Sequence, residues 1–158
     1  MLKVLTAALA LHGASAVAQL SPGTFAGVPR WADTALRAAG LDQGFTFSSR
    51  MNPALEVGDF DRDGLLDIAV EIRDAGGQRG GIAIVHRIDR SVHIVGAGRP
   101  LGDGKDRLAR RGAWTVTSRR HDRAHEGFTP DRIYIEDSGR HSGWLVWDGK
   151  AYVWIEGE

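Results

Sequence analysis

Hydrophobic and polar residues alternate along this chain in two different periods, and each period predicts a different kind of element. Between Pro29 and Gly40, Trp31, Leu36 and two alanines share one face at helical spacing, which predicts a short helix with proline in its first turn. From Phe45 onward, short runs rich in valine, isoleucine and aromatic residues are separated by glycine and aspartate, a pattern typical of strands and turns. We therefore expect one N-terminal helix followed by β structure.

The strands can be bounded from the same pattern. We expect strands at 55–57, 66–72, 82–88, 91–95, 114–118, 132–136, 143–147 and 151–155. Asp89-Arg90 would join one pair into a hairpin, and a turn at Asp148-Gly149 would join the last pair, because Asp-Gly favours hairpin turns. This succession predicts an α+β or mostly-β fold, with an antiparallel sheet of several short strands and hairpins and one N-terminal helix, not βαβ units.

The first residues have the order of a secretory signal. Lys3 precedes an apolar run at 4–11, and Ala16-Val17-Ala18 forms a small-residue cleavage site. The run is far shorter than the roughly 20 residues of a membrane-spanning helix, so no membrane span is expected; the alternative is a buried N-terminal helix. We predict a signal peptide at 1–18 cleaved after Ala18, a tail or linker at 19–28 and a single β-rich domain at 29–158, in a periplasmic or secreted protein.

Charge and cysteine content restrict the partners and the means of stabilisation. The chain has 20 basic and 20 acidic residues and no cysteine. A balanced charge argues against nucleic acid or an anionic membrane as the main partner. An exported domain without disulfides must be held by its core, or by a core and a metal. A protein or a carbohydrate remains as the class of partner, and the oligomeric state stays open.

One acidic segment, residues 59–67, carries the clearest chemistry. Carboxylates stand at loop positions 1, 3, 5 and 9, and Gly64 stands at position 6, where it permits a sharp turn. Alternate residues of a tightly curled loop point inward, so these oxygens can converge on one hard cation. We predict a Ca²⁺ site whose ligands are four carboxylates and one backbone carbonyl: Asp59, Asp61, Asp63, Leu65 and Asp67.

Two alternatives to a strand-bounded calcium loop exist for the same residues. An EF-hand needs glutamate at position 12, where this chain has Val70 within an apolar run typical of a strand. An acidic surface turn without an ion is the other, although its four carboxylates would repel one another at neutral pH. Magnesium suits the loop less than calcium does, because it prefers a tighter octahedron that retains waters.

The segment from Gly58 to Val70, continued through two glycine pairs to the strand Ile82–Val85, resembles one FG-GAP or VCBS-type repeat. The resemblance implies that the loop aspartates and one carbonyl hold calcium, and it falls on the five ligands named above. Glu71-Ile72-Arg73 stand where the family has Gly-Ala-Pro. Tandem copies of the repeat build propellers, and this chain has one copy, so a full propeller is not expected.

Two pairs of histidines are further candidates. His121 and His125, with Glu126 beside the second, have the spacing of a zinc site on a helix, but the surrounding segment reads as a loop. His86 and His93 flank the Asp89-Arg90 turn and could face each other across a hairpin, as cross-strand polar pairs commonly do without a function.

The C-terminal hairpin is the best candidate for ligand binding. Trp144 and Trp147 are an odd number of residues apart and should project from opposite faces, whereas Tyr152 and Trp154 should share a face. At least one face should be core, and an exposed aromatic pair could bind a sugar ring or a protein.

The favoured function is therefore an exported, non-enzymatic binding or interaction module in which calcium is structural. The alternative is an exported hydrolase acting on a cell-wall or carbohydrate substrate. Ser138 and His141 lack the sequence around a nucleophile elbow. The candidate catalytic residues of such a hydrolase are carboxylates and histidines: Glu56, Glu71, Asp106, His121 and His125.

Overall fold

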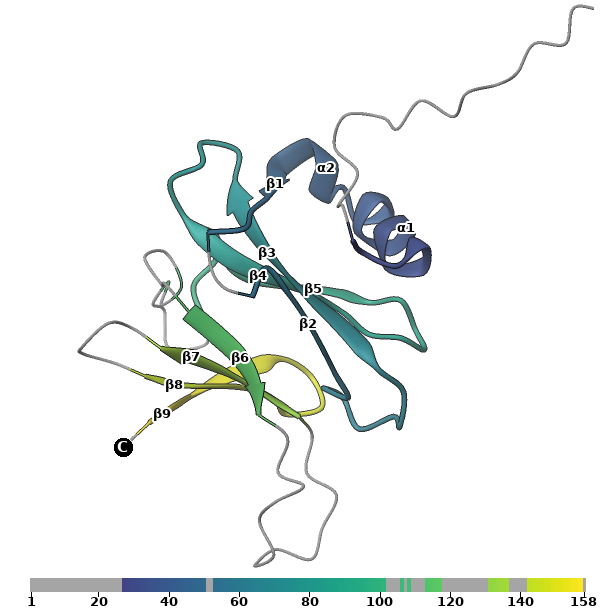
Figure 1. The fold of residues 1–158 in the computed structure, drawn as a ribbon, viewed down its shortest axis with the longest axis vertical. Coiled ribbons are helices and arrows are strands. Elements are labelled where there is room, and N and C mark those ends of the chain that lie inside the picture. The colour runs from purple at the N-terminus through teal and green to yellow at the C-terminus, as the bar shows by residue number, and fades with distance from the viewer. Residues whose placement is uncertain are drawn as a thin grey trace, which may run out of the picture.

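The chain forms three layers: a pair of short helices, a first β-sheet and a second β-sheet (Figure 1). The computed structural model describes residues 27–50, 53–101, 106, 108, 113–117, 131–136 and 142–157. The predicted signal peptide at 1–18 and nearly all of the predicted linker lie outside these residues, and both stay predictions.

The helical layer begins where the sequence pattern placed it. Helix α1 spans Arg30–Ala38, directly after Pro29, and a second helix, α2, spans Leu41–Gly44. Leu36 and Leu41 are buried against the first sheet. Helix α2 was not expected, because four residues are too few to establish a helical period.

The first sheet is antiparallel and is centred on its longest strand. Strand β3 pairs with β1 and β2 on one side and with β4 on the other, and β5 pairs with β4. The five strands are β1 (Phe45–Phe47), β2 (Leu55–Gly58), β3 (Asp67–Asp74), β4 (Gly80–Val85) and β5 (Val92–Gly96). Every residue of β4 is buried, because helices cover one face of this sheet and the second sheet covers the other.

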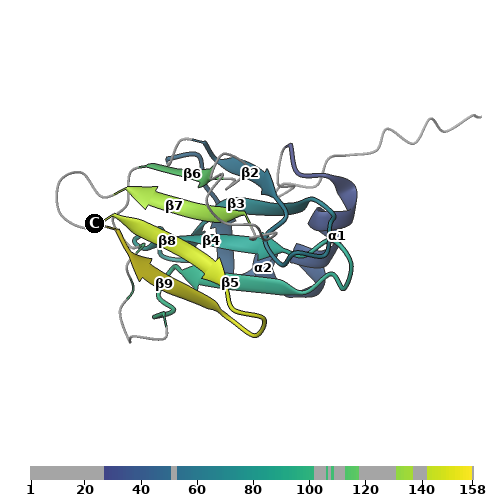
Figure 2. The same ribbon diagram turned by 90° about the horizontal axis from the view of Figure 1, so that it is seen from below.

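The second sheet is a simple antiparallel meander. Its strands follow in chain order as β6 (Ala113–Thr117), β7 (Arg132–Glu136), β8 (Gly143–Trp147) and β9 (Tyr152–Glu156). Figure 2 shows this sheet lying face to face with the first. The predicted mostly-β class is thus confirmed, and neither a closed barrel nor a propeller occurs in the described parts of the chain.

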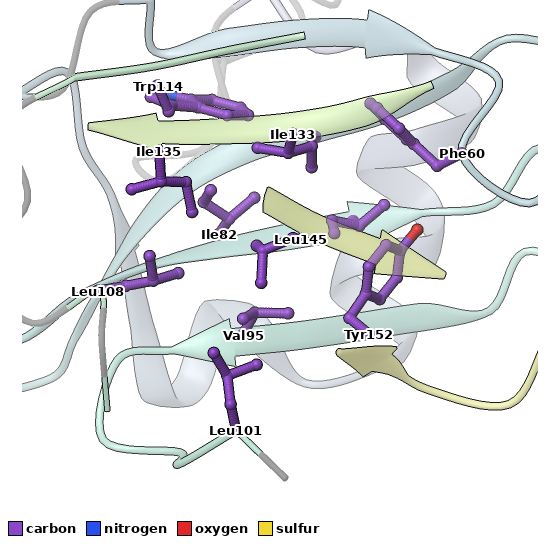
Figure 3. Close-up of a cluster of buried hydrophobic side chains, with 12 residues drawn as sticks. Phe60, Ile82, Val95, Leu101, Leu108, Trp114, Ile133, Ile135, Leu145 and Tyr152 are labelled. Carbon is purple, nitrogen blue, oxygen red and sulfur yellow. The ribbon is translucent and has the colours of Figure 1, made fainter. Parts of the chain in front are cut away.

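Alternation along the strands divides the apolar residues between two cores. On the helix side of the first sheet, Ile68, Val70 and Ile72 of β3 pack against α1 and α2. Between the sheets, Ile82 and Ile84 of β4 face residues of the second sheet. Figure 3 shows this inter-sheet core, with Phe60 and Tyr152 at one end and Trp114 and Leu108 at the other.

The hairpin loops are longer than the sequence indicated. The predicted hairpin of β8 and β9 is confirmed, but its last paired residues are Trp147 and Tyr152, so the loop comprises 148–151 and extends beyond the predicted turn at Asp148-Gly149. Asp148 shows why: its side-chain oxygen accepts the N–H groups of Lys150 and Ala151, which stabilises a wider turn. Only Gly149 in this loop has a positive φ, +99°.

No described helix is both long and apolar enough to cross a lipid bilayer.

Candidate metal centre

The acidic loop connects β2 to β3 and is closed at its base by the sheet. Gly58 and Asp67 are the last paired residues of these two strands, so 59–66 leave the sheet as a compact loop. Gly64 has φ +87°, a conformation that glycine adopts without strain, and it supplies the sharp turn predicted at position 6. Leu65 follows this turn, and its carbonyl as a ligand stays a prediction.

Three of the predicted ligands converge. Carboxylate oxygens of Asp59, Asp61 and Asp63 lie within 4.8 Å of one another. Each carboxylate is oriented by one backbone N–H of the loop itself: Asp61 Oδ1 accepts from Asp63 (3.0 Å), Asp63 Oδ1 from Leu65 (2.7 Å) and Asp59 Oδ2 from Gly64 (3.2 Å). These hydrogen bonds engage one oxygen of each aspartate, and the second oxygen of Asp61 lies 3.4 Å from Nδ1 of His86.

Two of these second oxygens are buried without a partner. Asp59 Oδ1 and Asp63 Oδ2 are shielded from solvent, and neither has a hydrogen-bond partner among the described residues. No arginine or lysine side chain in that part of the protein forms an ion pair with the loop aspartates. Buried anionic oxygens are costly unless something compensates their charge. Burial also raises the pKa of Asp59, which shows the same cost.

Asp67 occupies a different position from the other three carboxylates. It is completely buried, and its oxygens accept the backbone N–H of Phe60 (2.9 Å) and of Arg87 (2.7 Å). One of its oxygens also lies within 4.8 Å of ligand atoms of Asp61 and His86. Asp67 thus fastens the loop to the β4–β5 hairpin and forms the inner wall of the site.

His86 extends this inner wall into the core between the sheets. Its Nδ1 lies 3.4 Å from Asp61 Oδ2, and its Nε2 is 2.8 Å from the Tyr152 hydroxyl. The rings of His93 and Trp147 pack beside it, with centroids at 4.6 and 4.8 Å. Burial lowers the pKa of His86, against the opposing effect of Asp61.

The loop is also tied to the second sheet. Asp59 and Asp131 bond reciprocally: Asp59 N–H donates to Asp131 Oδ2, and Asp131 N–H donates to the Asp59 carbonyl, both at 2.9 Å. Asp131 immediately precedes β7. Phe60, the second residue of the loop, is 1% exposed and belongs to the inter-sheet core. Order in the loop is therefore coupled to the packing of the two sheets.

Sequence reasoning found the loop but missed the residues that surround it. Asp131 and Tyr152 come close to the loop and to His86 only because the two sheets stack, so no local sequence pattern indicates them. His86 could have been found, because the register Ile68↔Val85 of the β3–β4 hairpin places it opposite Asp67. The predicted approach of His86 and His93 is confirmed.

The other sequence candidates fall into two groups. The alternation predicted for the C-terminal hairpin is confirmed, with Tyr152, Trp147 and Trp154 packed in the inter-sheet core and Trp144 on the opposite face beside Tyr134. The second group lies outside the described residues: His121, His125, Glu126, Ser138 and His141.

Comparisons with known proteins identified no relative. A scan against protein-family models, a search of curated proteins and a search of solved structures each gave no match. The resemblance of 58–85 to an FG-GAP or VCBS-type repeat consequently stays a prediction based on the loop residues.

The buried position of Asp67 predicts a pH dependence of stability in the metal-free protein. Burial raises the pKa of Asp67 to about 7 from its ordinary value of 3.8. The folded state then binds a proton at Asp67 more tightly than the unfolded state does. The stabilisation from this proton is complete below the pKa that Asp67 has in the unfolded chain, and it is lost as pH rises through 7. We expect the free energy of unfolding to fall between about pH 5 and pH 7, with a slope approaching about 1.4 kcal/mol per pH unit.

Urea unfolding in the presence of a chelator measures this slope. Asp67→Asn should flatten it, whatever that variant costs in absolute stability, because the titrating group is gone. A wild-type slope that is zero or of opposite sign would contradict the prediction.

Proposed function

We propose that this protein is a calcium-binding module in which the ion has a structural role. The observation that carries the proposal is the pair of buried oxygens, Asp59 Oδ1 and Asp63 Oδ2, that have no hydrogen-bond partner in the described structure. Their two carboxylates and that of Asp61 have oxygens that lie within 4.8 Å of one another. A hard divalent cation bound there would compensate the charge of these oxygens.

The donor set favours calcium over other common ions. Asp59, Asp61 and Asp63 offer only oxygen, and the Leu65 carbonyl would add a fourth oxygen donor. Calcium accepts six to eight oxygens in irregular geometry, whereas magnesium requires a near-ideal octahedron. A curled loop with three carboxylates at alternate positions suits the first ion better than the second.

The structural role follows from where the loop is attached. The loop contacts the first sheet through Asp67, the second sheet through Asp131 and the core through Phe60. A cation that orders the loop would stabilise all three attachments together. Because it binds only the folded state, it should stabilise that state by RT ln(1 + [Ca²⁺]/Kd).

The surface that best fits a partner is the outer face of the second sheet. A groove of about 760 Å³ lies there, lined by aromatic, hydroxyl and charged side chains that include Tyr134, Trp144, Ser142 and Glu156. The rings of Tyr134 and Trp144 are 5.5 Å apart and tilted by 52°. Aromatic faces beside polar groups suit a carbohydrate ring, the favoured ligand of the proposed binding module.

A hydrolase is the second candidate and has less support. Two of its candidate carboxylates, Glu71 and Asp106, form local structural contacts. Glu71 is fully buried and accepts a hydrogen bond from the Ser48 hydroxyl at 2.7 Å. Asp106 accepts the backbone N–H groups of Gly98 and Leu108. Both contacts fit structural roles, so binding remains the favoured activity.

Calorimetric titration of the chelator-stripped protein with calcium tests the proposal. We expect one ion per chain in the wild type, and at least a hundredfold weaker binding in Asp63→Asn, because that variant replaces a charged ligand. Asp89→Asn, in the β4–β5 loop, is a matched control that should leave the affinity unchanged. The proposal fails if the wild type binds no calcium at millimolar concentration, or if both variants bind as the wild type does.

A further inference from the structure

Three ligand-bearing side chains meet on the inner wall of the acidic loop, apart from Asp59 and Asp63. An oxygen of Asp61, an oxygen of Asp67 and a ring nitrogen of His86 lie within 4.8 Å of one another. Their residues come from the loop, from the first position of β3 and from the position after β4. The β3–β4 register brings the last two together, so the sheet fixes their proximity, and Asp61 joins them from the loop.

Two members of this group, Asp67 and His86, are buried far more deeply than the calcium loop, to which the half-buried Asp61 belongs. Asp67 is 0% exposed and His86 is 2% exposed. Asp67 accepts two backbone N–H groups, from Phe60 and Arg87, but no arginine or lysine among the described residues forms an ion pair with either carboxylate. A buried carboxylate beside a second one is costly unless its charge is compensated. A cation would compensate both carboxylates at once.

The orientation of His86 matches that of a metal ligand. Its Nε2 is 2.8 Å from the buried Tyr152 hydroxyl, as a ligating histidine uses its second nitrogen to fix the ring. Its Nδ1 then faces Asp61 Oδ2 at 3.4 Å, which exceeds the usual length of an N–H···O hydrogen bond. Two ligands bound at about 2.0–2.1 Å to one tetrahedral zinc ion are separated by roughly 3.4 Å.

We propose that Asp61, Asp67 and His86 form a second cation site, which takes zinc and shares Asp61 with the calcium loop. Mixed nitrogen and oxygen donors suit zinc, whereas calcium prefers oxygen alone. Three protein ligands leave the fourth position of a tetrahedral ion for water. Two divalent ions balance the charge of the four aspartates of the loop. The inference goes beyond the calcium function and does not require calcium to be bound.

A calorimetric zinc titration of the chelator-stripped protein tests the site. The wild type should bind one ion that His86→Gln weakens at least a hundredfold, because this variant removes a ligand. His93→Gln is the matched control: its ring packs against His86 but belongs to neither carboxylate group. It should change the affinity less than threefold. Tyr152→Phe removes only the hydroxyl that orients His86, and should weaken zinc binding about tenfold.

The outcomes separate this site from the calcium site. Asp59→Asn combined with Asp63→Asn should abolish calcium binding and leave zinc binding intact. The proposal is overturned if His86→Gln still binds zinc, for instance through His121 and His125. It is also overturned if His86→Gln and His93→Gln lose zinc affinity equally. If His86→Gln does not fold, the visible spectrum of Co²⁺ bound to the wild type tests the site instead. An intense four-coordinate visible spectrum supports the site, and the weak spectrum of a six-coordinate ion refutes it.

Discussion

Calcium should raise the melting temperature of the wild-type protein by roughly 10 °C at a hundredfold excess over Kd, and Asp61→Asn should abolish the increase. The stabilisation expected at this excess is about 2.7 kcal/mol, which corresponds to a shift of this size in a domain of this length. Asp61 is the critical residue because it is the one aspartate that belongs to both ligand groups of the loop. Its replacement removes charge from the group of Asp59, Asp61 and Asp63 and from the group of Asp61, Asp67 and His86.

Differential scanning calorimetry with calcium and with a chelator measures the effect. Asp42→Asn is a suitable control, because Asp42 is an exposed aspartate on α2 that forms an ion pair with Arg37, at 3.8 Å, outside the loop. It should preserve the full calcium-dependent shift. An equal shift in Asp61→Asn and the wild type would show that calcium stabilises the protein from some other place.

Phe60→Ala should destabilise the protein by about 3–5 kcal/mol, a cost typical of removing a fully buried phenyl ring. Phe60 is 1% exposed and lies at one end of the inter-sheet core (Figure 3). Its backbone N–H also donates to Asp67, so the residue joins the loop to the core. We therefore expect the variant to bind calcium more weakly as well, because the loop loses its anchor.

Leu66→Ala provides the comparison within the same loop. Leu66 is 61% exposed, and its truncation should change the free energy of unfolding by less than about 0.5 kcal/mol. Urea unfolding in chelator, followed by calcium titration, gives both quantities for each variant. Similar losses of stability in the two variants would mean that Phe60 does not anchor the loop in the core.

The loop could be predicted because its geometry is local. Carboxylates at alternate positions around Gly64 converge within one short segment, and each is oriented by an N–H only a few residues away. The same holds for strands such as β7 and β8, whose predicted bounds agree with the structure. Period-two alternation and glycine placement act over short distances, so the sequence displays them directly.

The surroundings of the loop could not be predicted because they depend on long-range contacts. Asp131 is separated from Asp59 by 72 positions, and Tyr152 from His86 by 66. No spacing rule relates residues so far apart. Their approach is decided by which face of each sheet is buried and by how the two sheets stack.

By itself, the sequence determined that this protein is mostly β, that an acidic loop separates two strands, and that Asp59, Asp61 and Asp63 point to one place. The tertiary structure alone decided that Asp67 turns inward beside His86, and that the loop is attached to both sheets. The physical reason is the range of each interaction. Backbone turns and alternation are fixed by neighbours in the chain, whereas burial of a carboxylate against a histidine requires the whole sandwich to be assembled.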